Sequence, residues 1–129
     1  MQIEAQLSVF LDNRPGMLAR TCQALARERI NLRALSILDT VDHAMVRMVV
    51  DRPQDAERVL SELHATVQRR DVIVMDLENE AGAMALVAER LAAAGINIEY
   101  AYCTASATHS GGVLVLRTND LEATINALS

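Results

Sequence analysis

Two short segments of the chain carry side chains that together could bind a small zwitterion. Their polar and glycine residues are Asn13, Arg14 and Gly16 in the first segment, and Asn79, Glu80 and Gly82 in the second. An asparagine amide both donates and accepts hydrogen bonds, so it can hold either end of a zwitterion. A guanidinium can pair with a carboxylate, and a glycine lets a ligand come close to the backbone. These residue types therefore suit a molecule such as a free amino acid.

The surrounding sequence adds further charges and also an alternative interpretation. Asp12, Glu78 and Glu80 could meet the ammonium group of an amino acid. A helical pattern of apolar residues follows each segment, and the first N–H groups of a helix attract a carboxylate. The asparagines could instead be structural, because asparagine before a turn often forms an Asx turn or caps a helix. The sequence leaves both interpretations open.

Hydrophobic periodicity predicts the elements that would position the first segment. Apolar and polar residues alternate over 3–11, which is typical of a strand with one buried face. Met17, Leu18, Cys22 and Leu25 recur at helical spacing. Further patterns predict strands over 30–38, 44–50 and 65–68 and a helix over 55–63. The resulting order, β-α-β-β-α-β, is that of a ferredoxin-like unit.

The same pattern begins again at residue 71. We expect a strand over 71–77, a helix over 84–94, strands over 96–102 and 113–116, and a helix over 121–128. Gly95 is well placed just after the end of a helix, where a left-handed residue is needed. The sequence ends at Ser129, so we expect this half to lack a final strand and to leave a sheet edge that needs cover.

The two halves match at a constant offset of 66 residues. The matched positions are Asn13 and Asn79, Gly16 and Gly82, Ile30-Asn31 and Ile96-Asn97, His43 and His109, and Met48–Val50 and Leu114–Leu116. Several matches in register predict a tandem duplication, with repeats over 1–69 and 70–129. A unit of ~65 residues would be marginally stable alone. We therefore expect an α+β protein whose two repeats share one antiparallel sheet, with helices on one face.

Composition argues against several functional classes. The formal net charge is −5 and aromatic residues make up 2%, which disfavours a nucleic-acid surface. No apolar run approaches the ~20 residues of a membrane helix, and no signal-peptide pattern begins the chain, so we expect a cytoplasmic protein without a membrane partner. Cys22, Cys103 and the three histidines do not form a ligand set, so we expect no metal. No catalytic or phosphate-binding motif is present, so we expect neither an enzyme nor a cofactor.

The first turn and the segment after the first helix resemble a known family. The run Asn13-Arg14-Pro15-Gly16-Met17-Leu18, followed by Ile30-Asn31-Leu32, resembles the ACT domain, a small ligand-binding regulatory module. The second half carries a similar turn and a similar segment at the equivalent positions, although Ala81 replaces the proline and Glu80 stands where the first repeat has Arg14. The resemblance implies β-α-β-β-α-β units that pair side by side. It also implies a free amino acid as the ligand, bound between units beside the first strand-to-helix turn.

Carried over by position, the resemblance implies one ligand site in each repeat. The implied site residues are Asn13, Arg14, Pro15, Gly16, Met17 and Leu18, and in the second repeat Asn79, Glu80, Gly82, Ala83 and Met84. Tyr102 is a further candidate on its own chemistry, because its hydroxyl could bind a ligand. We therefore expect an amino acid-binding regulatory module that forms a homodimer. The alternative is a structural or dimerisation module that docks on a partner enzyme without binding a ligand.

Overall fold

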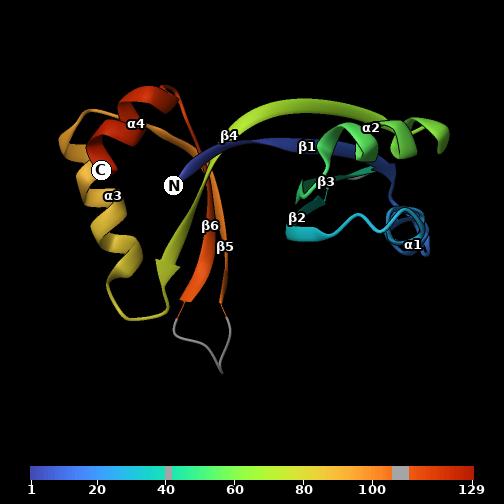
Figure 1. Cartoon of the computed structure of the whole chain (residues 1–129), viewed down its shortest axis with the longest axis horizontal. Coiled ribbons are helices and arrows are strands. Elements are labelled where there is room, and N and C mark those ends of the chain that lie inside the picture. Colours follow the sequence, from blue (N-terminus) through green and yellow to red (C-terminus); the bar gives the residue numbers. More distant parts are fainter. Residues whose placement is uncertain (40–41, 106–110) are drawn as a thin grey trace. The chain divides into compact units, whose positions relative to one another are not determined.

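The chain folds into strands and helices in the predicted order. The computed structural model describes residues 1–39, 42–105 and 111–129. Its elements are β1 (Gln2–Asp12), α1 (Met17–Arg27), β2 (Leu32–Asp39), β3 (His43–Val50), α2 (Pro53–Glu62), β4 (Thr66–Glu78), α3 (Ala83–Ala93), β5 (Ile98–Ala105), β6 (Gly111–Thr118) and α4 (Leu121–Leu128) (Figure 1). This order confirms the predicted α+β, ferredoxin-like fold, and the second repeat ends with β6 and α4.

Hydrogen-bonded strands form one six-stranded antiparallel sheet in the order β2-β3-β1-β4-β6-β5. The residues form two compact units. One is Ala5–Arg70, and the other combines Asp71–Ser129 with Met1–Glu4. β1 and β4 therefore each contribute residues to both units. The first four residues thus belong to the same unit as the second repeat, which the sequence pattern did not predict.

The unit Ala5–Arg70 buries one face of its strands beneath α1 and α2. β1 and β3 pair antiparallel, with Leu7 opposite Met48 and Val9 opposite Val46. Because side chains alternate between the two faces of a strand, these four residues share one face. All four are buried, and Leu25 of α1 is buried against the same cluster. The alternating apolar residues of the sequence thus supply the core of this unit.

The unit that contains Asp71–Ser129 repeats this arrangement. β4 and β6 pair antiparallel, with Ile73 opposite Leu116 and Met75 opposite Leu114. Leu91 of α3 is fully buried in the same cluster. α3 and α4 lie beside each other in this unit (Figure 1). The second repeat therefore has a core of its own, built from the same positions of the same elements.

One strand corrects the prediction for residues 65–77. The sequence predicted a short strand over 65–68 and a separate strand over 71–77, but the structure has one continuous strand, β4. Arg69, Arg70 and Asp71 separate the two apolar patterns, and all three are exposed. None of them is a glycine, proline or asparagine, and Asp71 alone is a residue type that is common in turns. The polarity of this stretch reflects exposure to solvent rather than a break in the strand.

The register of β6 corrects part of the repeat alignment. Leu7 of β1 pairs with Met48, and Ile73, the equivalent of Leu7 at an offset of 66, pairs with Leu116. Met48 therefore corresponds to Leu116, at an offset of 68, and not to Leu114. The β5–β6 connection is two residues longer than the β2–β3 connection, as the bounds of these strands show. A shift of two residues keeps every side chain on its face, so the apolar pattern concealed it.

The predicted pairing of His43 with His109 is displaced by the same shift. His43 pairs with Asp12 at the start of β3, and the equivalent position of β6 is Gly111, which pairs with Glu78. His43 is exposed, as expected for a residue next to a turn. His109 lies outside the described residues.

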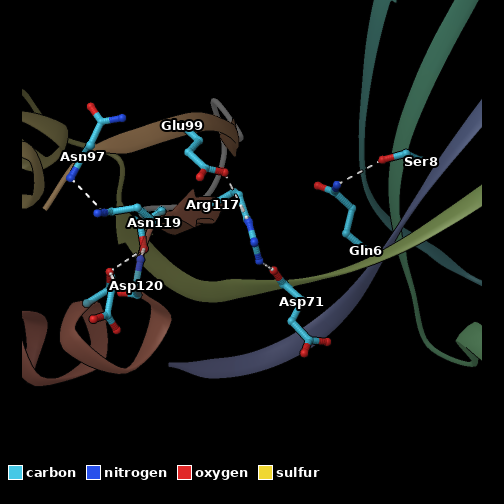
Figure 2. A network of polar contacts seen from close by, with 10 residues as sticks. Gln6, Ser8, Asp71, Asn97, Glu99, Arg117, Asn119 and Asp120 are labelled. Atoms are coloured by element: carbon cyan, nitrogen blue, oxygen red, sulfur yellow. Dashed lines mark hydrogen bonds and ion pairs between the residues drawn. The ribbon is translucent and has the colours of Figure 1, made fainter.

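Polar contacts close equivalent junctions in the two units. The Asn31 N–H donates to Asp51 Oδ1 at 3.0 Å, and the Asn97 N–H donates to Asn119 Oδ1 at 3.1 Å. Figure 2 shows the second of these contacts near Arg117. The Arg117 guanidinium donates to the Asp71 carbonyl at 2.6 Å and pairs with Glu99. These bonds hold the start of β5 against the end of β6, as Asn31 and Asp51 hold β2 against β3.

Candidate ligand-binding site

The turn between β1 and α1 is tight and begins the helix without a side-chain cap. Gly16 is the N-cap residue and has φ 87° and ψ −10°, which is the left-handed region that glycine tolerates. The Arg14 N–H donates to the Asp12 carbonyl at 2.9 Å, and the Met17 N–H donates to the Arg14 carbonyl at 3.4 Å. Because no side chain caps α1, a bound anion would face the positive end of the helix dipole.

The turn between β4 and α3 has the same backbone. Gly82 has φ 88° and ψ −9°. The Ala83 N–H donates to the Glu80 carbonyl at 3.3 Å, as Met17 does to Arg14 in the first repeat. A Cβ atom placed on Gly16 or Gly82 would meet no other heavy atom within 4 Å. Glycine is therefore required by backbone conformation at both turns, and open space adjoins both.

A cavity of about 230 Å³ lies beside the first turn. The β1 end, the first turns of α1 and the connection between α2 and β4 line it. Its lining residues are Phe10, Leu11, Asp12, Arg14, Met17, Arg20, Thr21, Leu63, His64 and Ala65. The Arg14 and Asp12 side chains are both largely exposed and 3.9 Å apart, so their ion pair is weak. The cavity thus combines an apolar floor with charged groups of both signs.

A cavity of about 210 Å³ lies at the equivalent place beside the second turn. Its lining residues are Met75, Asp76, Leu77, Glu78, Glu80, Ala83, Leu86, Val87, Arg90 and Leu128. Seven of them, from Asp76 to Val87, stand at an offset of 66 from lining residues of the first cavity. The duplicated sequence therefore forms the same kind of hollow twice.

The structure places four of the predicted site residues in the walls of these cavities. Arg14 and Met17 line the first, and Glu80 and Ala83 line the second. The other residues of the two predicted turns adjoin the cavities along the chain without lining them. They are Asn13, Pro15, Gly16 and Leu18, and Asn79, Gly82 and Met84. Leu18 and Met84 pack against the cores.

Asn13 and Tyr102 have other surroundings. The Asn13 Nδ2 donates to Asp39 Oδ1 at 2.7 Å, which ties the first turn to the end of β2. Tyr102 pairs with Val115 in β6, whereas the neighbouring Cys103 pairs with Leu114, which belongs to the core cluster beneath α3. Tyr102 therefore lies on the strand face turned away from the core, and it does not line the second cavity. Tyr100 shares that face, because it lies two residues before Tyr102 in the same strand.

Several lining residues were not among the predicted site residues. Arg20 and Thr21 follow Met17 by three and four positions, so they share its face of α1. This spacing was a usable signal. His64 comes from the connection after α2, which only the folded chain brings to the first turn. Arg90 reaches the second cavity from α3, four residues after Leu86.

A larger and more open groove adjoins the first cavity. It has a volume of about 760 Å³ and shares Phe10, Asp12 and His64 with that cavity. Leu38 and Met45 add to its apolar wall, and they are paired neighbours on β2 and β3. The groove therefore extends the first cavity over the strand face that α1 and α2 leave uncovered.

The described residues were also searched for metal-binding groups and for membrane-spanning helices. No group of three or more His, Cys, Asp or Glu residues within them is arranged to hold a metal ion. No helix among them has the length and hydropathy needed to cross a membrane.

The fold and the repeated turns agree with comparisons with known proteins. Residues 1–128 match the family described as an ACT domain pair. The chain therefore belongs to the ACT domain pair family. A search among curated protein sequences gave no match.

Solved structures extend this result. Protein BT0572 from Bacteroides thetaiotaomicron is 35% identical, with a TM-score of 0.90 over 98% of this chain and 86% of that one. The ligand-free regulatory subunit of aspartate kinase from Thermus thermophilus is 18% identical, with a TM-score of 0.73 over 99% and 95%. Aspartate kinase from Synechocystis is 23% identical, with a TM-score of 0.64 over 98% of this chain and 26% of that one. The fold is thus shared with the ACT domain pair family and with these solved structures.

Proposed function

We propose that this protein is a regulatory module that binds a free amino acid in the cavities beside Gly16 and Gly82, and that it has no catalytic activity of its own. The observation that carries the proposal is the duplicated hollow. In both repeats an uncapped helix start, a left-handed glycine and a charged cavity occur together. We further propose that the repeats 1–69 and 70–129 are the two ACT units.

The size of the cavities supports a small ligand. Sites for drug-sized ligands usually have volumes of ~300–1,000 Å³. The two cavities, at about 230 and 210 Å³, are smaller and suit one compact metabolite each. The charges support a zwitterion. Asp12 or Glu78 would meet the ammonium group, and the uncapped start of α1 or α3 would meet the carboxylate.

Regulation would then act through a partner. Among the structures with this fold is a regulatory subunit of aspartate kinase, which supports an output carried by a separate or attached enzyme. Binding that favours one state of the module would shift the partner by at most the difference in ligand affinity between its two states. The module would thus report the concentration of an amino acid to that enzyme.

Calorimetric titration of the chain with each of the twenty amino acids tests the proposal. We expect saturable binding of at least one amino acid. Asp12→Asn should weaken binding to the first cavity, because the carboxylate that faces the ammonium is lost. Glu62→Gln is the matched control, since Glu62 is an exposed carboxylate of α2 that pairs with Arg58 and lines neither cavity. Absence of binding by all twenty amino acids would contradict the proposal.

A homodimer is a second proposal and has separate support. β2 is an edge strand of the sheet, and three of its apolar side chains are exposed. They are Leu35, Ile37 and Leu38. An exposed apolar edge strand readily pairs with another chain. The same surface supports the alternative function, a dimerisation module without a ligand. A dimer mass without any amino acid binding would favour that alternative.

A further inference from the structure

The two cavities stand at equivalent places but differ in charge. At an offset of 66, Glu80 replaces Arg14 and Leu86 replaces Arg20. The first cavity has two arginines and one carboxylate in its lining. The second has three carboxylates, Asp76, Glu78 and Glu80, and one arginine. Duplication has therefore preserved the hollow and reversed its charge.

Arg20 is the charge that the first cavity leaves uncompensated. It is exposed on the second turn of α1 and lines the cavity together with Arg14. Within residues 1–39, 42–105 and 111–129, its guanidinium makes no ion pair or hydrogen bond. Within the same described residues, the Arg14 side chain has only the 3.9 Å pair with Asp12. A ligand with two negative groups would meet two guanidinium groups in the lining of one cavity.

We propose that the first cavity selects an amino acid whose side chain carries a second carboxylate, and that the second cavity excludes it. This inference rests on the proposed amino acid binding and adds the class of the ligand. The ligand ammonium lies beside Asp12, its α-carboxylate lies beside Arg14 at the start of α1, and its side-chain carboxylate lies beside Arg20. Each ligand charge then has an opposite partner. In the second cavity the three carboxylates repel the additional negative charge.

Paired ligands of equal shape isolate the effect of the second carboxylate. The affinity of the chain is measured by calorimetry for L-glutamate against L-glutamine and for L-aspartate against L-asparagine. Each amide is close in size to its acid and lacks the negative charge. We expect one acid to bind about tenfold or more tightly than its amide, because a charge-assisted hydrogen bond is lost in the amide. We also expect one molecule of the acid bound per chain.

Variants then assign the preference to the cavity. Arg20→Gln should reduce the preference for the acid about tenfold and leave the amide affinity nearly unchanged. Arg58→Gln is the matched control, because Arg58 is an exposed arginine of α2 that does not line the cavity. The melting temperature of each variant shows whether it is folded. If Arg20→Gln does not fold, Arg20→Ala is measured instead with the same expectation.

Different failures have different meanings. If the amides bind as tightly as the acids or more tightly, the inference is overturned while amino acid binding stands. The same holds if a basic amino acid is preferred, if two molecules of the acid bind per chain, or if Arg20→Gln keeps the full preference. If none of the twenty amino acids binds, the proposed function itself fails, and this inference fails with it.

Discussion

Gly16 and Gly82 are 66 residues apart in sequence and have the same backbone conformation, with φ 87° and 88° and ψ −10° and −9°. Each ends a turn after a long strand and begins a helix. The first hydrogen bond of each helix is also the same. The Arg20 N–H donates to the Gly16 carbonyl in α1, the Leu86 N–H donates to the Gly82 carbonyl in α3, and both distances are 3.0 Å. The two turns are therefore one local structure used twice, although their charged residues differ.

Substitution of the first of these glycines should be costly for a purely conformational reason. Gly16→Ala should lower the free energy of unfolding by about 1–2 kcal/mol, because a Cβ atom disfavours a positive φ while meeting no neighbour within 4 Å. Denaturant unfolding measures this change. Gly111→Ala is the control, since its surroundings are equally open and its φ is not in the left-handed region. Equal effects of the two substitutions would contradict this explanation.

At the ends of α1 and α3, a glycine can be introduced instead of removed. Arg29 has φ 56°, and Gly95, at an offset of 66, has φ 71°. The N–H groups after each helix bond in the same way, with Ile30 N–H to Leu25 O and Ile96 N–H to Leu91 O. Arg29→Gly should therefore stabilise the protein by about 0.5–1 kcal/mol, because glycine adopts this conformation without strain.

Gly95→Ala is the reciprocal variant and should destabilise by a similar amount. Thermal melting of both variants and of the unmodified protein shows whether each substitution raises or lowers the stability. A loss of stability in Arg29→Gly would show that the Arg29 side chain contributes more than its backbone strain costs.

The two cysteines should differ in reactivity. Burial raises the pKa of the Cys22 thiol on α1, and a raised pKa leaves less of the reactive thiolate at a given pH. Cys103 of β5 is exposed. Iodoacetamide at pH 8 should therefore modify Cys103 first, as peptide mass spectrometry would show. Faster labelling of Cys22 would mean that α1 opens readily from the core.

The edge strand β2 provides a test of the proposed dimer. Ile37 is 47% exposed there, so Ile37→Asp should leave the fold intact and place a charge on the edge. We expect the mass measured by light scattering to fall from that of a dimer to that of a monomer. Ser61→Asp, an exposed change on α2, should leave the mass unchanged. A dimer that persists in Ile37→Asp would exclude this edge as the interface.

The sequence predicted the fold through its periodicity, and the matches of Gly16 with Gly82 and of Asn31 with Asn97 hold in the structure. Alternation over 3–11 and helical spacing from Met17 to Leu25 predicted β1 and α1, because burial of one face imposes those periods. The match of His43 with His109 was misleading, since the β5–β6 connection is two residues longer. The pairing of the strands places Gly111 opposite Glu78. Matching residue types in the two repeats do not determine this pairing.

The candidate site was predictable where it is local in sequence. Arg14 and Met17 belong to the repeated turn, and both line the first cavity. Leu63, His64 and Ala65 come from the connection after α2, and only tertiary packing brings them to that turn. The continuity of β4 was missed because exposed polar residues resemble a loop when no partner strand is known.

The central claim, that a free amino acid binds beside the repeated turns, is tested most directly by amide chemical shifts. The ¹⁵N–¹H spectrum of the labelled chain is recorded while an amino acid that binds by calorimetry is added. The account predicts saturable shifts of the amides from Asp12 to Arg20, at the β1–α1 turn. Shifts confined to β2 and β5, with none at the turns of either repeat, would contradict it.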